Sequence, residues 1–281
     1  MTFSTPIPSA VYAVGTVCCW GVSDFLGGYV SRRFNSFLLA MLGHAAAFSM
    51  VLAIAAGNHL SVPPTRGMLW AMLAGASGGT ALALFYRALS QGNMGLAAPA
   101  STVIGAAIPA VFAIFTEGLP RPIAIAGFAL ALLGIWLISR PEESGAPQGI
   151  GLALIAGFGF AGFYICMKLA GSGAAPWFAV SSRGASFLLT AIITVAGRKF
   201  QPFYGAGAII GLFAGCLDVT GTMLFIRAAQ TGRLDTTVVL TSLYPVITVL
   251  LARAILKERF TLLKTAGMAA ALAAVPMIAR G

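Results

Sequence analysis

The stretch GMLWAMLAGASGGTALALFYRALSQG at residues 67–92 returns, in altered form, as GAIIGLFAGCLDVTGTMLFIRAAQTG at residues 207–232. At an offset of 140 residues, the two stretches share three glycines, a threonine and a Phe-x-Arg-Ala sequence. One fixed offset over this length indicates an internal duplication, and its period is far too long for a solenoid. The chain is therefore expected to consist of two large, equivalent modules.

The composition places both modules in a membrane. Of the 281 residues, 59% are hydrophobic and 9% are charged, whereas about 25% are charged in an ordinary soluble domain. The apolar residues fall into ten runs, each long enough, at about 1.5 Å per residue, to cross a hydrocarbon layer roughly 30 Å thick. A β-barrel would instead show alternating polar and apolar residues in segments of about ten. The predicted helical spans are residues 10–30, 35–57, 67–89, 94–116, 122–139, 149–168, 176–197, 204–226, 235–256 and 262–279.

The ten spans divide evenly between the two copies. The strongly polar sequence RPEESGAP at residues 140–147 falls between them. We therefore expect a first five-helix repeat at residues 1–140, a linker at residues 141–148 and a second five-helix repeat at residues 149–281. Because five is an odd number, the second copy enters the membrane upside down relative to the first. The expected fold class is an all-α membrane protein of ten transmembrane helices in two inverted repeats, as in many secondary transporters.

The charges indicate a lipid bilayer as partner rather than nucleic acid. The formal net charge is +10, but the Lys and Arg residues stand singly or in pairs at the ends of apolar runs, where they anchor loops to anionic headgroups. Residues 1–9 carry no Lys or Arg, so we expect no cleavable signal and a retained first span. Neither a disulfide nor a metal site is expected from the cysteines, which all lie inside apolar runs: Cys18, Cys19, Cys166 and Cys216.

Several motifs in both copies match a known transporter repeat. They are Trp20-Gly21, the Phe-x-Arg-Ala sequences at residues 85–88 and 225–228, and Tyr244-Pro245 followed by Glu258 and Gly267. With these motifs the chain resembles the EamA-type repeat of the drug/metabolite transporter superfamily, and within it the YddG-like transporters. The first copy has Glu117 and Gly127 in the expected places, but Ile104 stands where the second copy has Pro245.

The resemblance implies a small-molecule substrate, no cofactor, ten helices and both termini in the cytoplasm, in a bacterial inner membrane. The basic residues favour the opposite orientation, because the face away from the termini receives more Lys and Arg. This excess is small, and the orientation implied by the resemblance is preferred. A single chain suffices for such a transporter, so a monomer is compatible with the sequence.

Small residues form a row on one face of the third span, which includes Gly75 and Gly79, and of the eighth span, which includes Gly211 and Gly215. In lipid, such a row allows another helix to approach closely. Static packing and a sliding surface between the repeats are both open interpretations.

Prolines interrupt corresponding spans of the two copies. Pro99 and Pro109 fall in the fourth span, and Pro245 falls in the ninth. A proline inside a helix removes a hydrogen bond and kinks the helix. Non-helical backbone at membrane depth persists only beside a cavity or other protein, so these spans are predicted to contain helix breaks near the binding region. A passive kink is the alternative.

Asp24 and Asp218 are the only carboxylates well inside spans. Each costs about 2.5 to 3.5 kcal/mol at the centre of a helix, so each is expected to face a polar interior or a partner. They could form a proton or cation site, or an ion pair with Arg183 or Lys168. Lys168 could instead reach the headgroups from the end of its span. The buried His44 could be a proton relay or a packing residue.

The side chains predicted to line a central substrate site are Trp20, Asp24, Tyr86, Ser101, Phe160, Tyr164, Asp218 and Tyr244. The resemblance places the aromatic members around the cavity, and the polar tips of Trp and Tyr need partners away from lipid.

The leading hypothesis is a secondary transporter that exports small metabolites, with amino acids as the expected class, across the inner membrane by alternating access around this cavity. A proton-coupled exporter of cationic drugs, with Asp24 or Asp218 exchanging a proton for the cation, is the alternative. An enzyme is disfavoured because no HExxH or GxSxG motif occurs. A channel is disfavoured because no filter-like segment or ring of carboxylates is visible, and no GxxxxGK[ST] motif suggests an ATP-driven pump.

Overall fold

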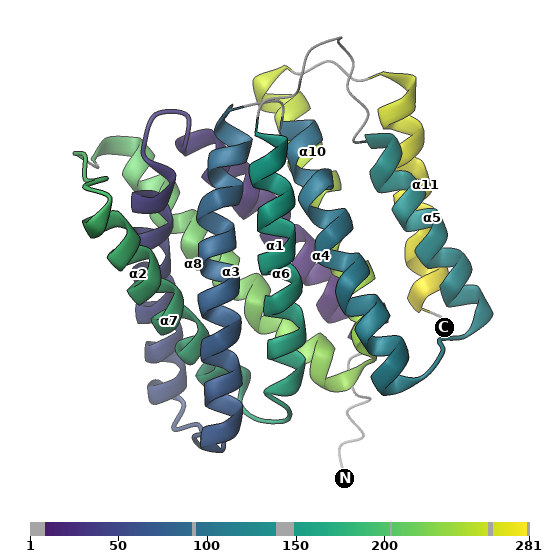
Figure 1. Ribbon diagram of the computed structural model, residues 1–281, viewed down its shortest axis with the longest axis horizontal. Coiled ribbons are helices and arrows are strands. Elements are labelled where there is room, and N and C mark those ends of the chain that lie inside the picture. The colour runs from purple at the N-terminus through teal and green to yellow at the C-terminus, as the bar shows by residue number, and fades with distance from the viewer. Residues whose placement is uncertain (1–8, 92–93, 139–148, 203, 258–260, 280–281) are drawn as a thin grey trace.

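The computed structural model describes residues 9–91, 94–138, 149–202, 204–257 and 261–279 (Figure 1). The helices in this part of the chain are α1 (Ser9–Val30), α2 (Ser36–Gly57), α3 (Thr65–Gln91), α4 (Met94–Glu117), α5 (Pro122–Ile138), α6 (Ile150–Leu169), α7 (Ala175–Ala196), α8 (Gly205–Thr231), α9 (Leu234–Thr241), α10 (Tyr244–Leu256) and α11 (Leu262–Ala279). Eight helical segments are long and apolar enough to cross a membrane, with α9 and α10 counted as one. Two shorter apolar segments lie in α5 and α11. The protein is therefore an all-helical membrane protein with ten spans, as predicted. The predicted linker lies outside the described residues.

The predicted ends of most spans lie within a few residues of the observed ones, and α8 differs most. It was predicted to end at residue 226 but continues to Thr231, and its counterpart α3 continues to Gln91. The apolar run stops at Arg227, but a helix can continue beyond the hydrocarbon layer. Here Thr231 Oγ1 donates to the carbonyl of Arg227 at 2.8 Å within the last turn.

The ninth span is interrupted part of the way across. α9 ends at Thr241 and α10 begins at Tyr244. Ser242 Oγ donates to the carbonyl of Val238 at 2.6 Å and so satisfies a carbonyl in the last turn of α9. Pro245 stands in the first turn of α10, where its missing N–H costs no helical hydrogen bond. The interruption therefore lies next to the proline that the sequence analysis singled out.

The fourth span is not interrupted, contrary to the predicted breaks at Pro99 and Pro109. α4 runs as one helix from Met94 to Glu117. A proline removes one hydrogen bond and can leave the rest of the helix in place, and α4 is held by its packing on α6, α9 and α10. The side chain of Pro99 is outside the described part. The two repeats thus differ at this helix, which is whole in the first and divided in the second.

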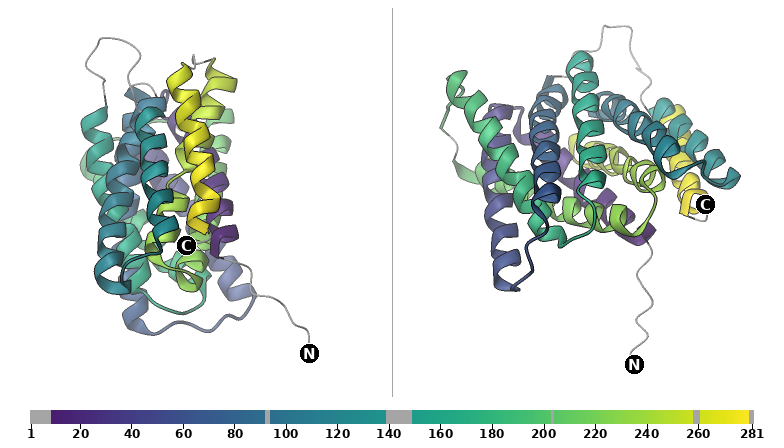
Figure 2. Two further views of the ribbon diagram at one scale, coloured as in Figure 1. Left: turned by 90° about the vertical axis from the view of Figure 1, so that its right-hand side faces the viewer. Right: turned by 60° about the horizontal axis from the view of Figure 1, so that its bottom comes forward.

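The two repeats interleave instead of forming separate bundles. α1 packs on α8 and α10, and its counterpart α6 packs on α3 and α4. α2 and α7 lie together at one end of the molecule, and α5 and α11 lie together at the other (Figure 1, Figure 2). Each of these pairs joins the first repeat to the second. The core is therefore built by both repeats jointly.

The crossings define two faces of the molecule. The start of α1 and the end of α11 reach the same face, which we name the termini face (Figure 1). The loops after Gly57, Glu117, Leu169 and Thr231 lie there too. The end of α5 and the start of α6 lie at the opposite face, named the linker face.

The rows of small residues lie at contacts between the repeats. A Cβ on Gly75 of α3 would lie 1.9 Å from the carbonyl oxygen of Ser182 on α7, and one on Gly79 would lie 2.4 Å from Ser186 Cβ. In the mirrored contact, a Cβ on Gly215 of α8 would lie 2.4 Å from the carbonyl oxygen of Gly43 on α2. The fourth predicted packing residue, Gly211, lies one turn earlier on α8. Its carbonyl oxygen would lie 3.8 Å from a Cβ added to Gly43. These close approaches fit the packing interpretation, while sliding stays a prediction.

Candidate functional site

A cavity lies between the two repeats where α1, α3, α6, α7, α8 and α10 meet. It holds about 480 Å³ of empty space, its open part included. Its walls carry seven of the predicted residues: Trp20, Asp24, Phe160, Tyr164, Arg183, Asp218 and Tyr244. They also carry Gly79, predicted as a packing residue, and six residues that the sequence did not single out: Gly78, Leu82, Phe163, Ser182, Ser186 and Thr222.

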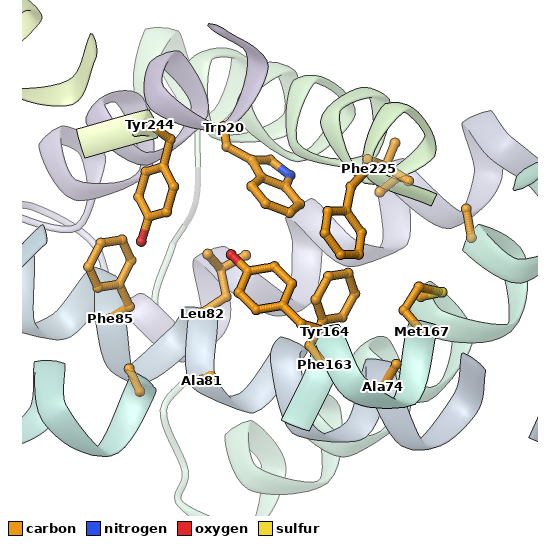
Figure 3. Close-up of a cluster of buried hydrophobic side chains, with 14 of the residues drawn as sticks. Trp20, Ala74, Ala81, Leu82, Phe85, Phe163, Tyr164, Met167, Phe225 and Tyr244 are labelled. Atoms are coloured by element: carbon orange, nitrogen blue, oxygen red, sulfur yellow. The ribbon is translucent and has the colours of Figure 1, made fainter. Parts of the chain in front are cut away.

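Aromatic rings gather around Trp20, one of the residues that line this cavity (Figure 3). The Trp20 ring centroid lies 5.6 Å from that of Phe225, 6.0 Å from Tyr164, 6.2 Å from Phe163 and 6.3 Å from Tyr244. Phe163 and Phe225 escaped prediction because a span that is apolar on every side gives no sign of which face turns inward. A signal did exist for Phe225, since the duplicated Phe-x-Arg-Ala sequence contains it.

Hydrogen bonds hold two of these aromatic side chains in place. Trp20 Nε1 donates to the backbone carbonyl of Asp218 at 3.1 Å. The hydroxyl of Tyr244 accepts from Thr102 Oγ1 of α4 at 3.0 Å. Both polar tips therefore have partners inside the protein, as expected for buried Trp and Tyr.

Arg183 and Asp218 form a buried ion pair between α7 and α8. Their side chains approach to 2.8 Å, between Arg183 Nη2 and Asp218 Oδ2. The same Nη2 donates to Thr222 Oγ1, and Nη1 lies 3.4 Å from His44 Nδ1. Of the two interpretations offered for Asp218, this geometry corresponds to the ion pair, with Arg183 rather than Lys168 as partner.

His44 is linked to Arg183 and to the backbone. Its Nε2 lies 3.4 Å from the carbonyl oxygen of Gly79. Because Arg183 can only donate, Nδ1 must accept and Nε2 must carry the proton. The imidazole therefore supports the guanidinium of Arg183, and in the described residues no hydrogen bond joins it to either aspartate.

Asp24 differs from Asp218 in having no partner among the residues that the structure describes. Its side chain lines the cavity, and the residue is 5% exposed. Among the described residues, no hydrogen bond or ion pair involves its carboxylate. A buried charge without a partner is costly in a membrane protein, so this carboxylate is suited to a ligand that supplies the missing contacts.

Two predicted site residues lie outside the cavity wall. Tyr86 lines a smaller adjoining cavity, with its hydroxyl 3.4 Å from Ser23 Oγ. Its ring packs so closely on α1 that a Cβ on Gly27 would lie 2.2 Å from it. Ser101 is buried in α4, where its hydroxyl donates to the carbonyl of Ala98 at 2.9 Å.

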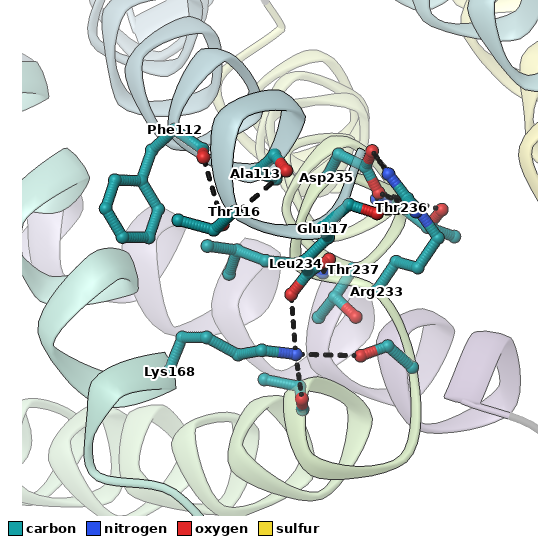
Figure 4. A network of polar contacts seen from close by, with 12 residues as sticks. Phe112, Ala113, Thr116, Glu117, Lys168, Arg233, Leu234, Asp235, Thr236 and Thr237 are labelled. Atoms are coloured by element: carbon teal, nitrogen blue, oxygen red, sulfur yellow. Dashed lines mark hydrogen bonds and ion pairs between the residues drawn. The ribbon is translucent and has the colours of Figure 1, made fainter. Parts of the chain in front are cut away.

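Lys168 belongs to a separate polar cluster on the termini face (Figure 4). Its Nζ lies 2.9 Å from Glu117 Oε1 and donates to the carbonyls of Ala229 and Gly232 at 3.0 and 3.1 Å. All three ammonium hydrogens are thereby used. The alternative that pairs Lys168 with an intramembrane aspartate is wrong, because the nearest carboxylate at its end of α6 is Glu117.

Glu117 connects this lysine to the start of α9 (Figure 4). Its Oε2 accepts from the backbone N–H of Leu234 at 2.9 Å, and its carbonyl accepts from Arg233 Nη1 at 2.9 Å. Arg233 also pairs with Asp235 at 2.8 Å, and this hydrogen-bonded contact raises the pKa of Arg233. We name Glu117, Lys168, Arg233 and Asp235 the Glu117 network. It ties α4, α6, α8 and α9 together at one face.

The chain is similar to known proteins both in sequence and in fold. A model described as the EamA-like transporter family matches residues 7–140 and, separately, residues 147–280. A solved structure titled "Crystal structure of protein" superposes with a TM-score of 0.76 at 16% identity, over 96% of this chain and 95% of that chain. At that identity the likeness concerns the fold alone. No curated protein was found to match the chain.

Proposed function

Because the chain belongs to the EamA-like transporter family of the drug/metabolite transporter superfamily, we propose that it exports amino acids across a bacterial inner membrane. The family makes it a multi-pass membrane transporter rather than an enzyme. The observation that carries the finer proposal is the cavity between the repeats, whose walls combine aromatic rings with Asp24 and the Arg183–Asp218 pair. Ligand sites typically combine apolar walls with a few polar groups that fix the orientation of the ligand.

Alternating access is the mechanism that this arrangement supports best. The cavity lies between inverted repeats, so a rocking motion of one repeat against the other would open it to each face in turn. In the present conformation, the Glu117 network joins four helices across the termini face. We propose that these contacts close the cytoplasmic side.

The route toward the linker face passes a second, smaller cavity. It shares Leu82 and Asp218 with the main cavity. Its other lining residues include Leu39 and Gly211, which stand in the first two turns of α2 and α8 near the linker face. Substrate leaving on that side would therefore pass between α2, α3 and α8, beside Tyr86.

Replacing Glu117 with glutamine is expected to weaken the closed termini face. The substitution removes the ion pair between Lys168 and Glu117, whose side chains are 28% and 19% exposed, respectively. The loss of stability should therefore be about 1 kcal/mol. Thermal unfolding in detergent measures it. Arg121→Gln, which alters an exposed side chain on the same face, is the matched control, and equal melting of both variants would contradict the assignment.

Counterflow tests the proposed function directly. Purified protein in liposomes loaded with unlabelled amino acids should accumulate a subset of labelled amino acids with saturable kinetics. Saturation and counterflow together indicate a carrier rather than a channel. Absence of counterflow for every amino acid would rule out amino acid transport.

A proton-coupled exporter of cationic drugs is the second candidate, and it is favoured by Asp24, which has no partner in the described part of the chain. A carboxylate without a protein partner can alternate between a proton and a cationic substrate. Such a transporter would take up drug cations into inside-out vesicles and release protons from them, as followed by a pH-sensitive dye. Both signals should disappear in Asp24→Asn, and drug uptake without proton movement would contradict the coupling.

A further inference from the structure

We infer that the cavity recognises its ligand through the amino group alone, by an ion pair with Asp24, so that amines lacking a carboxylate bind at the same site. The inference rests on the proposed transport function and specifies its substrate class. That class is organic ammonium ions with an apolar or aromatic body. The free amino acid is one member of it, and its carboxylate is tolerated but not recognised.

The first argument is that Arg183, the cation of the cavity wall, is already occupied. Its Nη2 contacts Asp218 and Thr222, and its Nη1 contacts His44. Within the described residues, only Nε lacks a partner, and that atom is buried. A ligand carboxylate would have to displace Asp218 to reach Nη2, the nitrogen that makes the ion pair. Separating a buried ion pair leaves an uncompensated buried charge, so displacement is unfavourable.

The second argument is that Asp24 is available. Its carboxylate faces the cavity and has no hydrogen bond or ion pair in the described part of the chain, although the residue is 5% exposed. With His44 neutral and both carboxylates ionised, Asp24, Asp218 and Arg183 give the described part of the wall one negative charge. A single ammonium group neutralises that charge, whereas a ligand carrying only a carboxylate adds to it.

The third argument comes from the position of the aromatic rings. Trp20 precedes Asp24 by four residues on α1, so both side chains lie on the same face of the helix. Tyr164 and Tyr244 lie near Trp20, with ring centroids 6.0 and 6.3 Å from its own. Aromatic faces attract ammonium groups and also provide apolar surface for the rest of the ligand. The wall therefore matches both halves of an amphipathic amine.

Three ligands that share a phenylethyl body separate the contributions of the amino group and the carboxylate group to binding. Phenylalanine carries both groups, 2-phenylethylamine carries only the amine, and N-acetylphenylalanine carries only the carboxylate. We expect 2-phenylethylamine to bind the purified protein within about tenfold of phenylalanine, and N-acetylphenylalanine to bind at least about 100-fold more weakly. Titration calorimetry in detergent measures all three.

Variants at one position identify the group responsible. Asp24→Asn should lose binding of both amine ligands, while Asp24→Glu, which restores the charge, should retain part of it. Glu142→Gln, which removes one negative charge from the predicted linker, is the matched control and should bind as the wild type does. An unchanged melting temperature of Asp24→Asn without ligand would show that the variant is folded; if it is not, the comparison of ligands on the wild type still decides the question.

The outcomes distinguish this inference from the transport proposal. Binding of phenylalanine but not 2-phenylethylamine, equal binding of N-acetylphenylalanine, or no binding of any of the three would overturn amine recognition, even if counterflow of amino acids is observed. Amine binding that depends on Asp24, without counterflow of any amino acid, would support the inference and rule out amino acid transport.

Discussion

Replacing Gly75 with alanine is expected to destabilise the protein by about 3 kcal/mol, because the added methyl group meets backbone rather than a movable side chain. The added Cβ would lie 1.9 Å from the carbonyl oxygen of Ser182 and 2.6 Å from its carbonyl carbon. α3 and α7 would have to separate, and the hydrogen bond from Ser186 Oγ to the Gly75 carbonyl, 2.8 Å long, would be lost with them.

Gly151→Ala is the matched control for this prediction. Gly151 lies in the first turn of α6, and a Cβ added there meets no atom within 4 Å. Since alanine is favoured over glycine in helices by up to about 1 kcal/mol, this variant should be as stable as the wild type or slightly more so. The measurement is thermal unfolding of both variants in one detergent. Equal melting temperatures would show that the close contact between α3 and α7 is not required.

Replacing Arg183 with methionine is the second substitution with a large expected effect. It leaves Asp218, which is 7% exposed, as an uncompensated buried charge, and breaking a buried pair in this way costs about 3 to 5 kcal/mol. It also removes the donor to Thr222. We expect a large fall in melting temperature, whereas binding of an ammonium ligand should not require this arginine, because Arg183 is a positive charge of the cavity wall.

The double variant Arg183→Met with Asp218→Asn tests the cause. If the unpaired charge is responsible, removing it should restore most of the lost stability, since replacing both partners of a buried pair is often nearly neutral. If the double variant is as unstable as Arg183→Met alone, the contacts of Arg183 with Thr222 and His44 are the important ones instead. Chemical denaturation of both variants and of Asp218→Asn completes the cycle.

The number of spans, the duplication and its inversion could all be predicted from the sequence. Apolar runs of membrane length leave little freedom, and an odd number of spans per copy fixes the relative orientation of the copies. Pro245 likewise pointed to the interruption between α9 and α10. The fourth span shows the limit of that argument, because α4 stays whole through Pro109 where neighbouring helices support it.

The pairing of side chains across the repeats could not be predicted in the same way. Nothing in the sequence shows that Arg183 lies beside Asp218 while Lys168 lies beside Glu117, because these pairs depend on which helices become neighbours. Phe163 was missed for the same reason. The duplication helped only where both copies retain a residue, as at Phe225, and neither intramembrane aspartate has a counterpart in the other copy.

The interleaving of the repeats also affects how the protein is made. The partner of Trp20 Nε1 on α1 is the Asp218 carbonyl, 198 residues later in the chain. At about 5 to 20 residues per second, the ribosome needs roughly 10 to 40 s to synthesise that stretch. Until α8 has been made, α1 lies in the membrane without the helix on which it packs most extensively. The first repeat therefore cannot complete its packing until the second repeat has entered the membrane.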